Sequence, residues 1–155
     1  MERITLITGG NKGLGFETAK ALKEQGHKVY IGSRDEARGQ KAAEALGVDY
    51  VQLDVTDDAS VQNAYKTIEN KEGRLDVLVN NAGISGGFAK PADLTVEDVE
   101  NVYNTNVFSI VRMMNTFIPL LEQSDQPVVV NVSSGLGSFG MVTNPDTQES
   151  KVNSL

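Results

Sequence analysis

The chain contains no cysteine and no tryptophan, and aromatic residues make up only 6% of its 155 residues. The absence of cysteine excludes a disulfide framework, a thiolate metal site and a cysteine nucleophile. Runs of Lys and Arg are also missing, and the formal net charge is −7. The cationic surface that nucleic acids and anionic membranes require is therefore absent. We expect no nucleic-acid partner, no membrane partner and no metal.

Long apolar runs are missing as well. Met1-Glu2-Arg3 leads directly into the apolar residues 4–7, a segment too short for the core of a signal peptide or for a membrane span. A chain of 155 residues of which 39% are hydrophobic suits one domain around one core. We therefore expect a cytoplasmic protein in which residues 1–155 belong to a single domain.

Short β-branched segments alternate with amphipathic segments along the chain. The predicted strands are residues 4–7, 28–32, 50–53, 77–79 and 128–132. The predicted helices are residues 13–25, 35–46, a segment around residues 61–68, and 95 to about 121. Asp35 and Gly47 suit the two ends of the second helix, and Thr95 with Asp98 resembles a capping box. Because no hairpin signal occurs, the alternation predicts an α/β, doubly wound, mostly parallel sheet of the Rossmann type with five strands.

A glycine-rich turn follows the first predicted strand, with the sequence Thr8-Gly9-Gly10-Asn11-Lys12-Gly13-Leu14-Gly15. A dinucleotide pyrophosphate binds at this place in a doubly wound fold, because glycine allows positive φ and a close approach of the backbone to phosphate. The spacing G-x-x-x-G-x-G differs from the commonest fingerprint G-x-G-x-x-G and from a Walker A loop. An ordinary glycine-rich turn is the alternative, and the position between a strand and a helix favours dinucleotide binding.

Three motifs together resemble those of the short-chain dehydrogenase/reductase family. The turn is similar to the family's Thr-Gly-x-x-x-Gly-x-Gly motif, Asn80-Asn81-Ala82-Gly83 to its Asn-Asn-Ala-Gly motif, and Asp54-Val55 to its adenine-ring contact. The segment Thr-Gly-Gly-Asn-Lys-Gly is particularly similar to carbonyl reductases. The resemblance implies an oxidoreductase that acts on a small carbonyl or alcohol substrate. It places cofactor contacts at Gly9, Asn11, Lys12, Gly13, Leu14, Gly15, Ser33, Arg34, Asp54, Val55, Asn81, Ala82 and Gly83.

The residues after the second predicted strand indicate which nicotinamide cofactor binds. NAD-selective sites place a carboxylate about 20 residues after the glycine turn, whereas this chain has Ser33-Arg34 there. Arg34 can form charge-assisted hydrogen bonds to a 2′-phosphate, and Lys12 can approach the same group. Basic residues at both places are similar to the family's NADP-preferring pattern, although solvated surface charges are an alternative. Asp35 could take the NAD role, but its position favours a helix N-cap, so we expect NADP(H).

Two polar residues are candidates for catalysis. Ser134 is the second serine after the fifth strand, at the sheet edge where ligands bind in such folds, and the resemblance implies that it hydrogen-bonds the substrate carbonyl. Asn106 is the amide on an otherwise largely apolar stripe of the long helix. Because an unpartnered buried amide costs about 1–3 kcal/mol, we expect either a satisfied structural amide that bends the helix or, as the resemblance implies, part of a proton relay. Both interpretations can hold together.

The family's Tyr-x-x-x-Lys motif is missing from the chain. The last tyrosine is Tyr103, and Lys151 has Thr147 four residues before it. In the family, the tyrosine protonates the substrate oxygen and the lysine lowers its pKa from about 10. We therefore expect the chain to be the inactive, dinucleotide-binding part of an NADP-dependent carbonyl reductase or alcohol dehydrogenase, a homo-oligomer when complete. A catalytically inactive dinucleotide sensor is the alternative, and the motifs disfavour a methyltransferase.

The fifth predicted strand also suggests a missing neighbour. Residues 128–132 are apolar enough for burial on both faces of a parallel sheet. In this chain we expect them at the sheet edge, uncovered by the polar loop predicted for residues 143–150. The long helix carries more apolar surface than one face of a small sheet needs. We therefore expect further strands and helices C-terminal to this chain.

Overall fold

The computed structural model describes residues 2–86 and 90–152. Within these residues, five strands form one parallel sheet in the order β3-β2-β1-β4-β5. The strands are β1 (Ile4–Thr8), β2 (Lys28–Ser33), β3 (Asp49–Gln52), β4 (Val77–Asn80) and β5 (Val128–Asn131). The chain continues to one side of β1 through β2 and β3, then crosses to the other side with β4. The doubly wound α/β fold is confirmed, and its topological switch point lies between β1 and β4.

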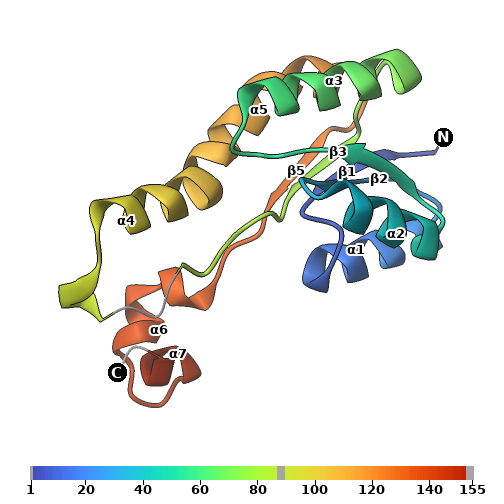
Figure 1. The fold of residues 1–155 in the computed structure, drawn as a ribbon. Coiled ribbons are helices and arrows are strands. Elements are labelled where there is room, and N and C mark those ends of the chain that lie inside the picture. Colours follow the sequence, from blue (N-terminus) through green and yellow to red (C-terminus); the bar gives the residue numbers. More distant parts are fainter. Residues whose placement is uncertain (1, 87–89, 153–155) are drawn as a thin grey trace.

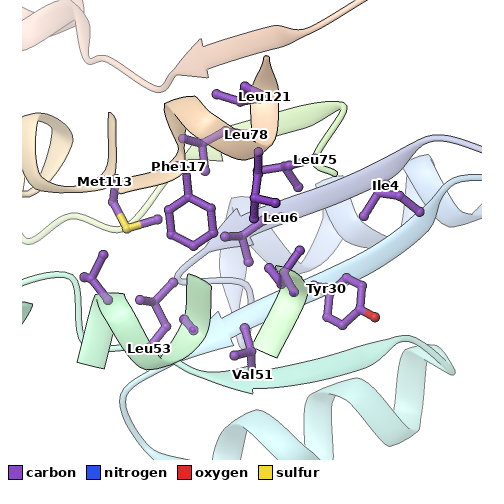
Figure 2. Close-up of a cluster of buried hydrophobic side chains, with 14 of the residues drawn as sticks. Ile4, Leu6, Tyr30, Val51, Leu53, Leu75, Leu78, Met113, Phe117 and Leu121 are labelled. Carbon is purple, nitrogen blue, oxygen red and sulfur yellow. The ribbon is translucent and has the colours of Figure 1, made fainter. Parts of the chain in front are cut away.

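Two layers of helices cover the sheet (Figure 1). Helices α1 (Gly13–Glu24) and α2 (Glu36–Leu46) pack on one face, and α3 (Asp58–Glu72) and α5 (Ser109–Leu121) on the other. Adjacent residues of each strand alternate between the two faces, so Leu6 packs with Phe117 of α5 while Ile7 packs with Ala19 of α1. Figure 2 shows the first cluster, in which Met113 and Phe117 of α5 lie over Leu6 and Leu78 of the sheet.

The helix ends follow the predicted capping residues. Asp35 accepts a hydrogen bond from Arg38 N–H at the start of α2, and Gly47 ends that helix with a left-handed φ of 64°. Thr95 and Asp98 form a reciprocal capping box at α4 (Val96–Tyr103). These bonds satisfy backbone groups that a helix end otherwise leaves without partners.

The long helix predicted from residue 95 to about residue 121 is continuous but not uniform. A π-helical turn, Asn104–Phe108, separates α4 from α5. The hydroxyl groups of Thr105 and Ser109 donate to the carbonyls four residues earlier, Asn101 at 3.2 Å and Thr105 at 2.5 Å. Wide turns of this kind are often found at functional sites. None of the helices in the described part of the chain combines the length and the apolar character that crossing a membrane would require.

The C-terminal part of the structure agrees only partly with expectation. As predicted, β5 is an edge strand, and its three valines are 37–43% exposed. The predicted polar loop, residues 143–150, is helical only at its ends, because α6 (Phe139–Thr143) ends in it and α7 (Gln148–Val152) begins in it. The Ser138 hydroxyl caps α6 by accepting from Met141 N–H. Such a cap stabilises a single helical turn that carries no apolar periodicity of its own, so the sequence pattern did not predict α6.

A buried carboxylate joins three segments at the end of the sheet opposite the glycine turn. Asp76, directly before β4, accepts hydrogen bonds from Ile4 N–H at 2.7 Å and from the Ser124 hydroxyl at 2.5 Å. Arg74 pairs with it at 3.2 Å. Burial raises the pKa of the Asp76 carboxyl, but the two hydrogen bonds and the Arg74 charge outweigh burial, so the pKa lies below its ordinary value. The ionised form is therefore stabilised by folding.

In acid solution, we expect the free energy of unfolding to decrease as the pH is lowered. A carboxyl whose pKa is lowered in the folded state contributes stability above its unfolded value, about 3.9 for Asp, and loses it as pH falls through the folded pKa. Asp76→Asn should therefore lower stability at pH 7 by about 1–3 kcal/mol. Below about pH 4, the variant should lose less further stability than the wild type does. Urea unfolding at pH 7, 4 and 3 measures this, with the exposed Asp125→Asn as the control. Parallel pH curves for wild type and Asp76→Asn would contradict the prediction.

Candidate functional site

A cavity of about 400 Å³ lies at the carboxyl ends of the strands, beside the switch point between β1 and β4. All the expected cofactor contacts except Gly15 line it, together with residues that follow β2, β3 and β4. The additional lining residues are Asp35, Arg38, Leu53, Thr56, Ile84 and Thr105. Clefts at this position are the usual ligand sites of open parallel sheets.

The glycine turn needs its glycines for two different reasons. Gly13 has a φ of +58°, and a Cβ there would meet nothing within 4 Å, so backbone conformation alone requires glycine. Gly15 has no such φ, but a Cβ would lie 2.4 Å from Asn81 Nδ2 and 2.7 Å from the Gly9 carbonyl oxygen. Gly15 is buried behind the turn and supports it. Leu14, by contrast, is 73% exposed at the cavity.

The turn is held to the end of β4 by Thr8 and Asn81. The Asn81 amide donates to the carbonyls of Thr8 at 2.9 Å and Gly9 at 3.2 Å. The Thr8 hydroxyl accepts from Asn81 N–H at 3.0 Å and Ala82 N–H at 2.9 Å. The two motifs therefore form one hydrogen-bonded unit. Thr8 was predicted as part of the glycine-turn motif but not as a site residue, although its place directly before the first glycine was a usable signal.

The N-terminus of α1 differs from those of the neighbouring helices. Asp35, Asp57 and Thr95 cap α2, α3 and α4 with their side chains. At α1, Lys12 occupies the N-cap position, and in the described parts of the chain no side chain caps it and no acidic residue lies in its first turn. The free N–H groups and the positive end of the helix dipole suit an anionic ligand. The first of these N–H groups belong to Gly13 and Leu14, which line the cavity.

Three cationic side chains line this cavity. Lys12, Arg34 and Arg38 all line it and are exposed. Asp35 also lines it, but one of its oxygens accepts from Arg38 N–H at 2.9 Å and the other lies 3.3 Å from Arg38 Nε. The interpretation of Asp35 as a helix cap is confirmed. Arg38 was missed, although its place in the first turn of the predicted helix 35–46, four residues after Arg34, was a signal.

The loop after β3 forms another wall of the cavity. Asp54 Oδ1 accepts from Thr56 N–H at 2.9 Å and from the Thr56 hydroxyl at 2.7 Å, and Asp54 N–H donates to the Ser60 hydroxyl at 2.9 Å. Both side-chain bonds end on Oδ1, so Oδ2 is available to a ligand donor. Asp54, Val55 and Thr56 all line the cavity, at the place expected for an adenine ring.

Asn106 is a satisfied structural amide. Its Oδ1 accepts from Ile84 N–H at 2.9 Å, and its Nδ2 donates to the Ile84 carbonyl at 2.8 Å. Asn106 lies within the π-helical turn, and Ile84 lines the cavity. The amide therefore ties the long helix to the loop after β4. This agrees with the structural interpretation of Asn106.

Ser134 lies beyond β5 but does not line the cavity. Its hydroxyl accepts from Leu136 N–H at 3.2 Å and caps a short 3-10 helix, Gly135–Gly137.

His27 lies at the opposite end of the sheet, where its Nδ1 is 2.8 Å from the Thr5 hydroxyl. Within residues 2–86 and 90–152, no three His, Cys, Asp or Glu side chains are grouped as metal ligands.

Comparison with known proteins finds a matching family model and similar curated proteins. A family model described as short chain dehydrogenase matches residues 3–151. The chain is 40% identical to short-chain dehydrogenase/reductase 1 of Saponaria officinalis, over 88% of this chain and 54% of that protein. It is 36% identical to (+)-neomenthol dehydrogenase of Arabidopsis thaliana, over 92% of this chain and 57% of that protein. The chain thus spans little more than half the length of these curated relatives.

Solved structures with the same fold include proteins with either nicotinamide cofactor. Salutaridine reductase from Papaver somniferum is 34% identical, with a TM-score of 0.82 over 93% of this chain and 61% of that chain. An NADP active-site complex of Pseudomonas aeruginosa RhlG is 31% identical, with a TM-score of 0.83 over 87% and 56%. 3-Ketoacyl-(acyl-carrier-protein) reductase of Brucella melitensis, complexed with NADH, is 31% identical, with a TM-score of 0.81 over 87% and 59%.

Proposed function

Since the chain belongs to the short-chain dehydrogenase family, we propose that it supplies the NADP(H) site of an oxidoreductase that interconverts a small carbonyl compound and its alcohol. The family binds NAD or NADP, and the choice of NADP rests on one observation. Lys12, Arg34 and Arg38 line a single cavity, while the one carboxylate that follows β2 there, Asp35, is bound to Arg38. Such a cluster attracts a 2′-phosphate, and both oxygens of Asp35 already have a partner on Arg38.

The residues present fit a dinucleotide along the length of the cavity. The uncapped N-terminus of α1 suits the pyrophosphate, because its N–H groups have no side-chain cap among the described residues. Gly13 leaves space where a Cβ would stand, so the backbone can approach the phosphates closely. Asp54 and Val55 form the wall proposed for adenine, and Ala82, Gly83 and Ile84 form the wall proposed for the nicotinamide end.

The bound nicotinamide would supply or accept the hydride, and the protein would position the reacting groups and hold the proton. We propose that Ser134, at the carboxyl edge of β5, hydrogen-bonds the substrate oxygen in the intact protein. Asn106 holds the loop at Ile84 in place through two backbone hydrogen bonds. We propose that this tether keeps the nicotinamide wall fixed while the substrate binds, in addition to any part that Asn106 takes in proton relay.

The proposal predicts that the intact protein binds NADPH about a hundredfold more tightly than NADH. Two charge-assisted contacts to the 2′-phosphate, at about 1.5–3 kcal/mol each, account for a preference of this size. The fluorescence of the reduced cofactor itself is a suitable signal for the titration. The preference should shrink as salt rises, since exposed charges are screened. Equal dissociation constants for NADPH and NADH would contradict the assignment.

A further inference from the structure

Arg112 of α5 contacts three segments that are distant in the sequence. Its Nη1 donates to the Val55 carbonyl at 2.8 Å, and its Nε pairs with Asp58 in the first turn of α3. Its Nη2 lies 3.5 Å from Asn104 Oδ1 at the start of the π-helical turn. The side chain of Arg112 is only 21% exposed. A guanidinium group suits this place because it presents several donors in a fixed planar geometry.

The π-helical turn explains how one side chain reaches both Asn104 and Val55. Residues eight apart in an α-helix lie about 80° from each other around the axis, because each residue turns the chain by about 100°. A π-helical turn takes up one additional residue, so Asn104 and Arg112 come to the same face. The same turn carries Asn106, which binds the backbone of Ile84. One helix therefore contacts the backbone of both opposite walls of the cavity, at Val55 and at Ile84.

We propose that Arg112 is a positioning residue for cofactor binding, which fixes the adenine wall of the cavity through the Val55 carbonyl. The proposal rests on the proposed NADP(H) site and goes beyond it, because Arg112 lies outside the cavity lining. Leu53 and Val55 bury their side chains in the core, and Asp54 and Thr56 face each other through hydrogen bonds. Besides this packing, the hydrogen bond from Arg112 to the Val55 carbonyl attaches the loop to α5.

The bond to Val55 is expected to matter more than the ion pair with Asp58. Asp58 is 83% exposed, and exposed ion pairs contribute little. The bond to Val55 is made to a backbone carbonyl within the cavity wall, and its loss allows the loop to adopt other positions. A site whose supporting contacts are loosened binds its ligand more weakly, even when every contacting residue is retained.

The test compares ligand binding by the intact protein with four matched variants. Arg112→Gln should raise the dissociation constant for NADPH and for 2′,5′-ADP about tenfold, the effect of one lost charge-assisted bond. Arg112→Lys keeps the charge near Asp58 but not the planar donors, so it should give an intermediate value. Asp58→Asn should change binding less than twofold. Thr116→Ala is the control, since Thr116 also joins α5 to α3, through Gln62 at 3.5 Å, without contacting the loop.

Two further measurements distinguish positioning from general stability. Circular dichroism melting establishes that each variant is folded at the temperature of titration. Hydrogen exchange should show faster exchange of the amides of residues 54–57 in Arg112→Gln and unchanged exchange at residues 81–84. Unchanged 2′,5′-ADP binding in both Arg112 variants, or an equal loss in Thr116→Ala, would overturn the proposal. If wild type binds neither NADPH nor 2′,5′-ADP, the proposed function fails first, and the role of Arg112 fails with it.

Discussion

Replacing Arg34 by Asp is expected to reverse the cofactor preference of the intact protein, with a change of about a thousandfold in the ratio of the NADPH and NADH dissociation constants. The substitution removes a cation that lines the cavity beside Lys12 and Arg38. It also adds a carboxylate beside the position proposed for the 2′-phosphate, and like charges at close range repel. For NADH the new carboxylate can accept a hydrogen bond from the ribose 2′-hydroxyl, so its affinity should rise.

Two control variants separate this local effect from net charge. Arg34→Gln removes the cation without adding an anion, so it should weaken NADPH binding by about tenfold and leave NADH binding unchanged. Lys20→Asp makes the same change in net charge on the exposed face of α1, away from the cavity lining. It should leave both dissociation constants unchanged. The assignment of Arg34 is wrong if Lys20→Asp and Arg34→Asp shift the ratio equally, or if neither shifts it.

Much of the fold could be predicted because the decisive signals are local. The strands, their parallel arrangement and the capping of α2 and α4 follow from short apolar runs and from Asp35, Thr95 and Asp98. The π-helical turn could not be predicted, because the apolar stripe of the long helix has the spacing of an unbroken helix. The turn accompanies contacts between Asn106 and Ile84, which lie 22 residues apart. Such contacts depend on how the sheet brings two segments together.

In the candidate site, too, residues marked by a local pattern could be predicted, and contacts between distant segments could not. Motif residues such as Gly13, Asn81 and Asp54 line the cavity where a local pattern placed them. The position of Ser134 at the edge of the sheet was expected, but its capping bond to Leu136 N–H depends on the following turn. Arg112 gave no sequence signal, because its acceptor is the backbone carbonyl of Val55, 57 residues earlier. A backbone carbonyl is present at every residue, so no residue type marks it in the sequence.

Gly15→Ala tests whether the two motifs act as one unit at the cofactor site. The added methyl would lie 2.4 Å from Asn81 Nδ2 and 2.7 Å from the Gly9 carbonyl oxygen. The Asn81 amide would have to leave the carbonyls of Thr8 and Gly9, which it now binds. We therefore expect the dissociation constant for NADPH to rise at least about a hundredfold, as several backbone–phosphate contacts are lost together. Overpacking should also lower stability by about 1–3 kcal/mol.

Gly10→Ala is the comparison that separates these two effects. A Cβ at Gly10 would lie 2.7 Å from Ile31 Cβ, so this variant should lose a similar amount of stability. Gly10 belongs to the same turn but does not line the cavity or contact Asn81, so its NADPH affinity should fall much less. Titration at a low temperature, where circular dichroism shows both variants folded, measures the difference. If the two variants lose affinity equally, destabilisation of the turn explains the loss, and the Asn81 amide has no separate role in shaping the site.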